Sequence, residues 1–335
     1  MSSRLQPKTS PAYGVDSEIV DYILGITFDI WEKRQVDDIL HYYGEDVTVY
    51  GLDQVTHGAG TMVDQTHATL RAFPDRLLLG DDVICAGNTS RGYSSHRVVS
   101  PMTNQGDTVF GPATGKRVYA MNIADCEIND GLITREWLVR DNLALVSQLG
   151  FDAQRAAQEM AGRFENNTWQ WIESEFERVS NTPAAPGEFI ADKEPWSAEA
   201  FSRHALESCW VSGNSVQLQA AYAPYCVLHR APVRTISGRQ ATLKHYADWR
   251  KILPSLHLSV DHVCSQPFGD NGVNIAARWS VAGLQGAAFA GIEATGKPLY
   301  ILGVTHWRVI GGRIVSEWTV FDEIAIAAQA IYQQG

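Results

Sequence analysis

The spacing of apolar residues changes from a helical to a strand period along the first half of the chain. Apolar residues three to four positions apart predict helices over residues 16–44 and 60–73, with a short strand at 47–51 between them. From residue 76 to residue 141 the pattern is that of strands, interrupted by turn residues such as those at 129–131. We therefore predict an α+β domain in which helices precede a long antiparallel meander.

The second half of the chain repeats the first. Residues 131–150 align without a gap onto residues 312–331, with 8 of 20 positions identical where chance would give about one. The same offset carries Tyr119 onto Tyr300, and a similar offset carries Tyr43 onto Tyr222. Because this period is far too long for a solenoid, each copy is expected to be a domain. The predicted units are a first domain over residues 16–150, a helical connector with a linker over 151–196, and a second domain over 197–333.

Composition and charge exclude several classes of function. The chain has 45% hydrophobic and 19% charged residues and no uninterrupted apolar stretch of the roughly 18 residues that a membrane span needs. Its formal net charge of −11 would repel a phosphate backbone, so we expect neither a membrane nor a nucleic-acid partner. The N-terminal residues carry no apolar secretory segment, so we expect a cytoplasmic protein.

The sequence contains no motif for a metal or a nucleotide cofactor. The five cysteines are scattered and form no C-x-x-C pair, which argues against a disulfide framework and a zinc site. Neither a glycine-rich dinucleotide loop nor an H-E-x-x-H helix occurs. We expect a reaction without a cofactor or a metal, on a small-molecule substrate.

Short motifs recur at matching places in the two copies. The first copy carries Phe-Pro-Asp before its first long strand and Thr-Gly-Lys before the penultimate strand. Glu-Trp, a single aspartate and Gln-Leu-Gly follow. These motifs stand at residues 73–75, 114–116, 136–137, 141 and 148–150. The second copy keeps only part of the set. This pattern resembles the SnoaL-like polyketide cyclase family of the nuclear transport factor 2-like superfamily. The resemblance implies a tandem duplication of a cone-shaped fold, in which a curved antiparallel sheet wraps around the N-terminal helices.

The last strand of each copy carries the first candidate catalytic residues. By the period of two, Asp141 shares a face with Trp137, and Asp322 shares a face with Trp318. If this face lines a pocket, burial raises the pKa of each carboxyl and makes it a plausible proton shuttle. The resemblance implies that this aspartate is the general acid/base. The alternative is that both aspartates cap the helices that follow them.

The strand register decides which groups stand beside these aspartates. A three-residue turn would place Tyr119 opposite Asp141 and Tyr300 opposite Asp322, where a hydroxyl could polarise a carbonyl, whereas a two-residue turn would not. His306 is a third candidate donor. The remaining candidates, expected to bind substrate, are Trp137, Trp318, Tyr50, His229, His67 and His245.

Two further pairs recur in the repeat without being assigned to the pocket. Glu136 and Glu317 stand on the opposite strand face from the aspartates and are expected to be surface or interface groups. Arg97 and Arg278 recur in mid-strand and are expected to form ion pairs between the copies rather than to hold an anionic ligand.

These features predict a cofactor-free enzyme that moves protons next to the carbonyl group of a small compound, as a cyclase, isomerase or lyase. The alternative is a non-catalytic binding or assembly protein, which is favoured if the aspartates cap helices and Trp137 and Trp318 fill the pockets. Pockets below about 300 Å³ would support it. An epoxide hydrolase is a weaker alternative. Both sheet faces carry apolar residues, so we expect an internal pseudo-dimer, sheet against sheet, with a further homodimer left open. Part of the helical segment at 151–179 should cover a sheet edge or a pocket mouth.

Overall fold

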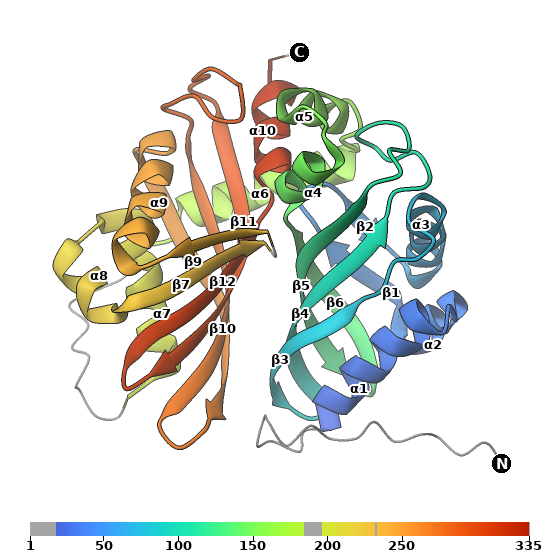
Figure 1. Cartoon of the computed structure of the whole chain (residues 1–335), viewed down its shortest axis with the longest axis horizontal. Helices are drawn as coiled ribbons and strands as arrows, with labels where there is room; N and C mark the ends of the chain where they lie inside the picture. The colour runs from blue at the N-terminus through green and yellow to red at the C-terminus, as the bar shows by residue number, and fades with distance from the viewer. Residues whose placement is uncertain (1–17, 184–195, 232, 335) are drawn as a thin grey trace.

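The computed structural model describes residues 18–183, 196–231 and 233–334. The expected N-terminal segment without a secretory signal, and most of the expected linker, lie outside these residues. Two six-stranded sheets face each other, each with helices on its outer side (Figure 1). The predicted α+β tandem duplication is therefore confirmed.

The first copy forms a cone from short helices and a curved sheet. Its strands run in the order β2-β1-β6-β5-β4-β3. Its elements are α1 (Glu18–Thr27), the π-helical turn η2 (Phe28–Glu32), the 3-10 turn η3 (Val36–Asp38), α2 (Ile39–Tyr42), β1 (Tyr43–Tyr50), β2 (Val55–His57), α3 (Ala59–Ala72), β3 (Leu79–Gly87), β4 (Arg91–Thr103), β5 (Arg117–Asn129) and β6 (Leu132–Arg140).

The sheet is mixed rather than antiparallel throughout. Strands β3 to β6 form the predicted antiparallel meander, but β1 pairs with β6 in parallel, for example Tyr50 with Trp137. The helix expected to reach residue 44 ends at Tyr42, because the chain becomes extended at Tyr43 and enters β1 there.

The second copy repeats this topology, with the strand order β8-β7-β12-β11-β10-β9. A π-helical turn follows the first helix in both copies. The elements are α7 (Ala198–Glu207), η4 (Ser208–Ser212), α8 (Ser215–Ala221), β7 (Tyr222–Ala231), β8 (Arg234–Ser237), α9 (Arg239–Ile252), β9 (Leu256–Phe268), β10 (Gly272–Leu284), β11 (Pro298–Ile310), β12 (Arg313–Phe321) and α10 (Glu323–Tyr332).

Helix α4 (Asn142–Leu149) ends the first copy, as α10 ends the second, and the described part of the connector contains α5 (Ala153–Ala161) and α6 (Asn166–Ser180). Helix α5 packs against α10, as Figure 1 shows. Helix α6 lies against the second sheet, where Arg178 forms an ion pair of 3.1 Å with Asp261 and Trp171 meets the edge of Tyr300. The connector also covers an edge of the first sheet, as predicted. The Val55 amide of the edge strand β2 donates to the Thr168 hydroxyl at 3.0 Å, and the Asn167 side-chain amide donates to the Val55 carbonyl at 3.2 Å.

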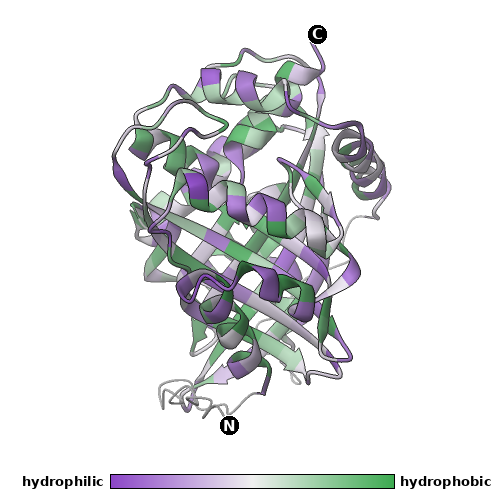
Figure 2. Ribbon diagram, turned by 90° about the vertical axis from the view of Figure 1, so that its right-hand side faces the viewer, coloured by the Kyte–Doolittle hydropathy of each residue, from purple (hydrophilic) through white to green (hydrophobic). Residues whose placement is uncertain are grey.

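The two sheets pack face to face, as predicted. Tyr93 of the first copy stacks on His262 of the second at 3.4 Å, and the Arg278 guanidinium lies 3.5 Å from the centre of the Trp137 ring. Arg278 also forms the expected ion pair between the copies, with Asp125 at 3.7 Å. Hydrophobic residues (green) and hydrophilic residues (purple) alternate along many strands in Figure 2.

Candidate functional site

A cavity of about 200 Å³ lies inside the first copy, between its helices and the inner face of its sheet. We call it the first-copy cavity. Aliphatic side chains such as Ile26, Ile30 and Val98 form much of its wall. The polar and charged groups that line it are Thr27, Tyr43, Gln54, Thr56, Gln65, Thr66, Thr69, Arg76, His96, Asn122, Glu136 and Arg140.

Strand β6 turns the opposite face to this cavity from the one that we assumed. Glu136, Leu138 and Arg140 line the cavity, whereas Trp137 contacts the second copy. The expectation that Glu136 and Glu317 are surface or interface groups is wrong, because both carboxyls are buried inside their cones. Both faces of the sheet are covered, so the alternation alone could not show which one is concave.

Glu136 is the only carboxyl group in the lining formed by the described residues. Its side chain is 4% exposed, and the Tyr43 hydroxyl donates to it at 3.0 Å. Burial raises the pKa of Glu136, while the Tyr43 hydrogen bond and the Arg140 charge oppose the rise. A buried carboxyl with a raised pKa that faces a cavity is a candidate for proton transfer.

The next polar groups follow one another across the sheet beside Glu136. His96 lies opposite Ala124, and Asn122 lies opposite Arg140, so these groups occupy successive rows of the cavity floor. Burial and the nearby Arg97 charge lower the pKa of His96 to about 4, so its imidazole is neutral at pH 7. Its Nε2 has no hydrogen-bond partner within the described part of the chain.

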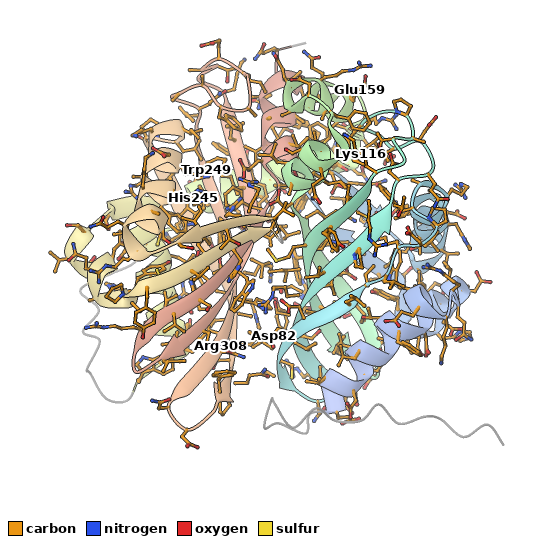
Figure 3. All side chains as sticks on the ribbon, viewed as in Figure 1. Asp82, Lys116, Glu159, His245, Trp249 and Arg308 are labelled. Atoms are coloured by element: carbon orange, nitrogen blue, oxygen red, sulfur yellow. The ribbon has the colours of Figure 1, made fainter. Side chains whose placement is uncertain are left out.

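The same space in the second copy is filled by aromatic rings. Trp279 stands where the first copy has Val98, and its indole lies over Gly303, where any Cβ would clash with it. Trp249 of α9, labelled in Figure 3, stands where the first copy has Thr69. The rings that meet in this cluster are Trp210, Tyr246, Trp249, Trp279 and Phe321.

Glu317 is the equivalent of Glu136 in the second copy, and its surroundings are different. Its carboxyl accepts hydrogen bonds from Tyr222 at 2.5 Å, Thr319 at 2.6 Å and Trp307 Nε1 at 3.1 Å, and also from the Tyr246 hydroxyl. The first copy keeps only the equivalent of Tyr222, which is Tyr43. Glu317 is therefore satisfied within the core, whereas Glu136 faces an open cavity.

Asp141 and Asp322 lie at helix ends between the two copies, outside the lining of the first-copy cavity. Asp141 caps α4 by accepting from the Ala144 amide at 2.9 Å, and it lies 3.4 Å from the Arg234 guanidinium of the second copy. Asp322 caps α10 and accepts from the Asn142 side chain at 2.5 Å. The capping geometry of our alternative interpretation is thus present at both aspartates.

The predicted pairing of tyrosines with these aspartates is wrong. The Asp141 amide donates to the Met121 carbonyl. The hairpin closes through a two-residue turn, with Asn129 paired to Leu132, and an irregularity between Glu127 and Ile128 shifts the register by one more residue. Tyr119 therefore lies two residues farther along and is 40% exposed. Tyr300 is buried at the second sheet, where its hydroxyl contacts Ser280 and Glu175.

Most of the other predicted site residues meet at the interface between the copies. His306 lies 2.7 Å from the Ser95 hydroxyl and 3.0 Å from Arg97 of the first copy. Trp318 stacks on His229, and Trp137 stacks on Tyr50. Arg97 lies over the Trp318 ring but forms its ion pair within its own copy, with Asp81 at 2.7 Å, so the expectation of an ion pair between the copies holds only for Arg278.

The two remaining histidines stand apart from this group. His67 is exposed on α3. His245 lines a separate hollow of about 210 Å³ beside α9, near Arg234 and Glu323, and is labelled in Figure 3. The structure does not bring either histidine into the first-copy cavity.

The sequence did contain a signal for the groups that we missed. Tyr43 recurs as Tyr222 and Glu136 recurs as Glu317, and each pair forms the same hydrogen bond inside its cone. A tyrosine and a glutamate that recur together far apart in sequence could have indicated a contact. The sequence favoured Asp141 and Asp322 instead, because a carboxylate on a strand face that also carries tryptophan is unusual.

Both copies of this fold match the same family of known proteins. The SnoaL-like polyketide cyclase family matches residues 23–149 and 201–330. The chain belongs to this family. As a tandem SnoaL-like protein it contains the family domain twice, which agrees with the two sheets. Within the described ranges, no helix is long and apolar enough to cross a membrane.

Solved structures similar to this SnoaL-like protein each match about the length of one copy. TsrD from Streptomyces laurentii is 20% identical, with 40% of this chain and 95% of that chain covered and a TM-score of 0.36. AclR from Streptomyces galilaeus is 23% identical, with 40% and 98% covered and a TM-score of 0.35. A SnoaL-like polyketide cyclase from Agrobacterium tumefaciens is 19% identical, with 41% and 100% covered and a TM-score of 0.34. Among proteins with curated descriptions, none matches this sequence.

Proposed function

We propose that the first copy is a cofactor-independent enzyme that moves a proton next to the carbonyl group of a small compound, with Glu136 as the general acid/base. The observation that supports this most is the buried Glu136 carboxyl, which faces a cavity and has Tyr43 as its one hydrogen-bond donor among the described side chains. The second copy, whose interior is filled, supports the fold of the first.

The proposed reaction begins with a carbonyl compound whose α-carbon lies beside Glu136. The Glu136 carboxylate takes the α-proton, and the electron pair left on the carbon shifts to the carbonyl oxygen as an enolate. The neutral His96 and the Asn122 amide line the adjoining rows and would donate to that oxygen. Return of the proton to another carbon gives an isomer, and attack of the enolate on a second carbonyl closes a ring.

Proton exchange tests this proposal without knowledge of the natural substrate. Small ketones and β-keto esters are incubated in D₂O, and the loss of the α-proton signal is followed by NMR. We expect exchange catalysed by the wild type to fall by about 10²- to 10⁴-fold in Glu136→Gln, since that substitution removes the base. Asp141→Asn is the control and should keep most of the exchange. Unchanged exchange in Glu136→Gln, or its loss only in Asp141→Asn, would contradict the assignment.

A non-catalytic binding protein is the second candidate. The cavity of about 200 Å³ is below the lower end of about 300 Å³ for pockets that hold drug-sized ligands, and both aspartates cap helices. Saturable ligand binding with no α-proton exchange would favour this candidate. The epoxide hydrolase alternative needs two carboxyl groups around one water, and the described lining offers only Glu136.

A further inference from the structure

Arg76 faces the first-copy cavity without an acidic partner. Its Nε donates to the Ser100 hydroxyl at 2.9 Å, and its guanidinium lies 4.7 Å from the centre of the Trp31 ring. Among the described residues, no carboxylate lies within 4.0 Å of it. Burial and the nearby Arg140 charge lower the pKa of Arg76 to about 9, so it still carries its charge at pH 7.

Arg140 lies in the same lining but is already paired. Its Nη1 donates to both oxygens of Asp53, the shorter distance being 2.9 Å. Charged side chains inside proteins are nearly always paired, because an unpaired charge loses its hydration without compensation. Arg76 lines the cavity, and within the described residues its side chain forms a hydrogen bond through Nε only, so its two outer nitrogens are available to an anion from solution.

The second copy provides an internal comparison for this arginine. The residue equivalent to Arg76, two positions after the matching proline, is Leu256, and the residue equivalent to Arg140 is Phe321. Both charges are missing from the copy whose interior is filled by aromatic rings. An arginine needed only for the fold would be expected in both copies. The arginine is instead present in the copy that has the cavity and absent from the copy whose interior is filled.

We infer that the first-copy cavity binds a small carboxylate, held by Arg76 at the end of the cavity away from Glu136. The planar guanidinium fork matches two carboxylate oxygens. A monoanion fits better than a phosphate dianion, because Asp53 already neutralises Arg140 and Glu136 adds a carboxyl to the same cavity. This inference rests on the proposed function: the substrate class becomes a keto acid whose carboxylate binds at Arg76 and whose α-carbon lies at Glu136.

Binding of matched probes tests the inference separately from catalysis. Levulinate and 3-benzoylpropionate are titrated against the full-length chain by calorimetry, each beside its methyl ester, and inorganic phosphate is titrated in parallel. We expect at least one acid to bind about tenfold or more tightly than its ester, because only the acid forms the charged pair with Arg76. Arg76→Gln should remove this preference and Arg76→Lys should keep part of it. Arg155→Gln, which removes a charge from a side chain that is 75% exposed, is the control.

Each outcome decides between the two claims. Esters that bind as tightly as acids to the wild type, acid binding that Arg76→Gln leaves unchanged, or no binding of either acid would overturn the inference. Phosphate binding tighter than both acids would overturn the choice of a carboxylate. Acid binding that Glu136→Gln retains while it loses α-proton exchange supports both claims, whereas acid preference without exchange in the wild type supports the ligand class and contradicts the enzyme. The wild-type comparison of acid and ester stands even if Arg76→Gln fails to fold.

Discussion

Glu136 and Glu317 occupy the same strand position, yet their neighbours give them different chemistry. Tyr246, Trp307 and Thr319 donate to Glu317, and in the first copy their places are taken by Thr66, Cys126 and Leu138. The Glu317 carboxyl is thus enclosed by four hydrogen-bond donors, whereas the Glu136 carboxyl has one donor and a cavity beside it. Three substitutions around one glutamate thus separate a structural group from a candidate acid/base.

Asp322 gives a pH-dependent prediction at the residue scale. Burial raises the pKa of this carboxyl from 3.8 to about 8, so the folded chain holds its proton more tightly than the unfolded chain. The contribution of Asp322 to the free energy of unfolding therefore decreases as the pH rises from about 4 to about 8, and the decrease levels off above that pH. One such proton gives a slope approaching about 1.4 kcal/mol per pH unit.

The measurement is urea unfolding at several pH values between 6 and 8.5. The unfolding free energy of Asp322→Asn should fall less steeply with pH than that of the wild type, because the amide cannot ionise but still accepts from the α10 amides. Parallel pH curves for the two proteins would show that Asp322 does not titrate in this range.

At the scale of the elements, the repeat predicted more than the periodicity did. The recurrence of residues 131–150 at 312–331 indicated two copies with one topology, and the structure contains them. The parallel pairing of β1 with β6 could not be predicted, because it joins strands far apart in sequence. A strand buried on one side only would have indicated its inner face, but β6 carries Trp137 toward the second copy and Leu138 toward the cavity.

Polar residues led the sequence-based prediction to the sheet face that meets the second copy. His306, Arg97 and Asp125 are polar groups on mid-strand positions, which is what a binding pocket contains. Here they bond to one another across the interface: Ser95 lies between Asp125 and His306. A single sequence does not show whether a polar strand face meets a ligand or another polar face, so the candidate site could be predicted only in its chemistry, not in its position.

The aromatic filling of the second copy gives a stability prediction. Trp279→Ala should lower the unfolding free energy by about 3–5 kcal/mol, because it opens a hole among rings that are fully buried. Val98→Ala at the equivalent position borders an existing cavity and should cost about 1.5 kcal/mol, since about two buried methylene equivalents are lost. Chemical unfolding of both variants makes the comparison, and equal losses would mean that the second interior is not tightly packed.

At the scale of the whole molecule, each copy depends on the other to cover its sheet. Ile84, Ile123 and Trp137 of the first copy belong to the same buried cluster as the second copy. A fragment of residues 1–180 would expose this face, so we expect it to form dimers or larger assemblies. Size-exclusion chromatography with light scattering provides the test, with the full-length chain beside it. A fragment that stays a monomer at all concentrations would show that the interface is not needed to cover the sheet.

The asymmetry between a hollow and a filled cone has a consequence for how such a protein can change over evolutionary time. In a symmetric homodimer every substitution occurs twice, so a tryptophan that stiffens one interior closes both sites. Covalent fusion of the copies breaks that symmetry: Trp279 can occupy one cone while Val98 leaves the other open. The duplicated chain can therefore accumulate stabilising residues in one half while substitutions in the other half change which ligands it binds.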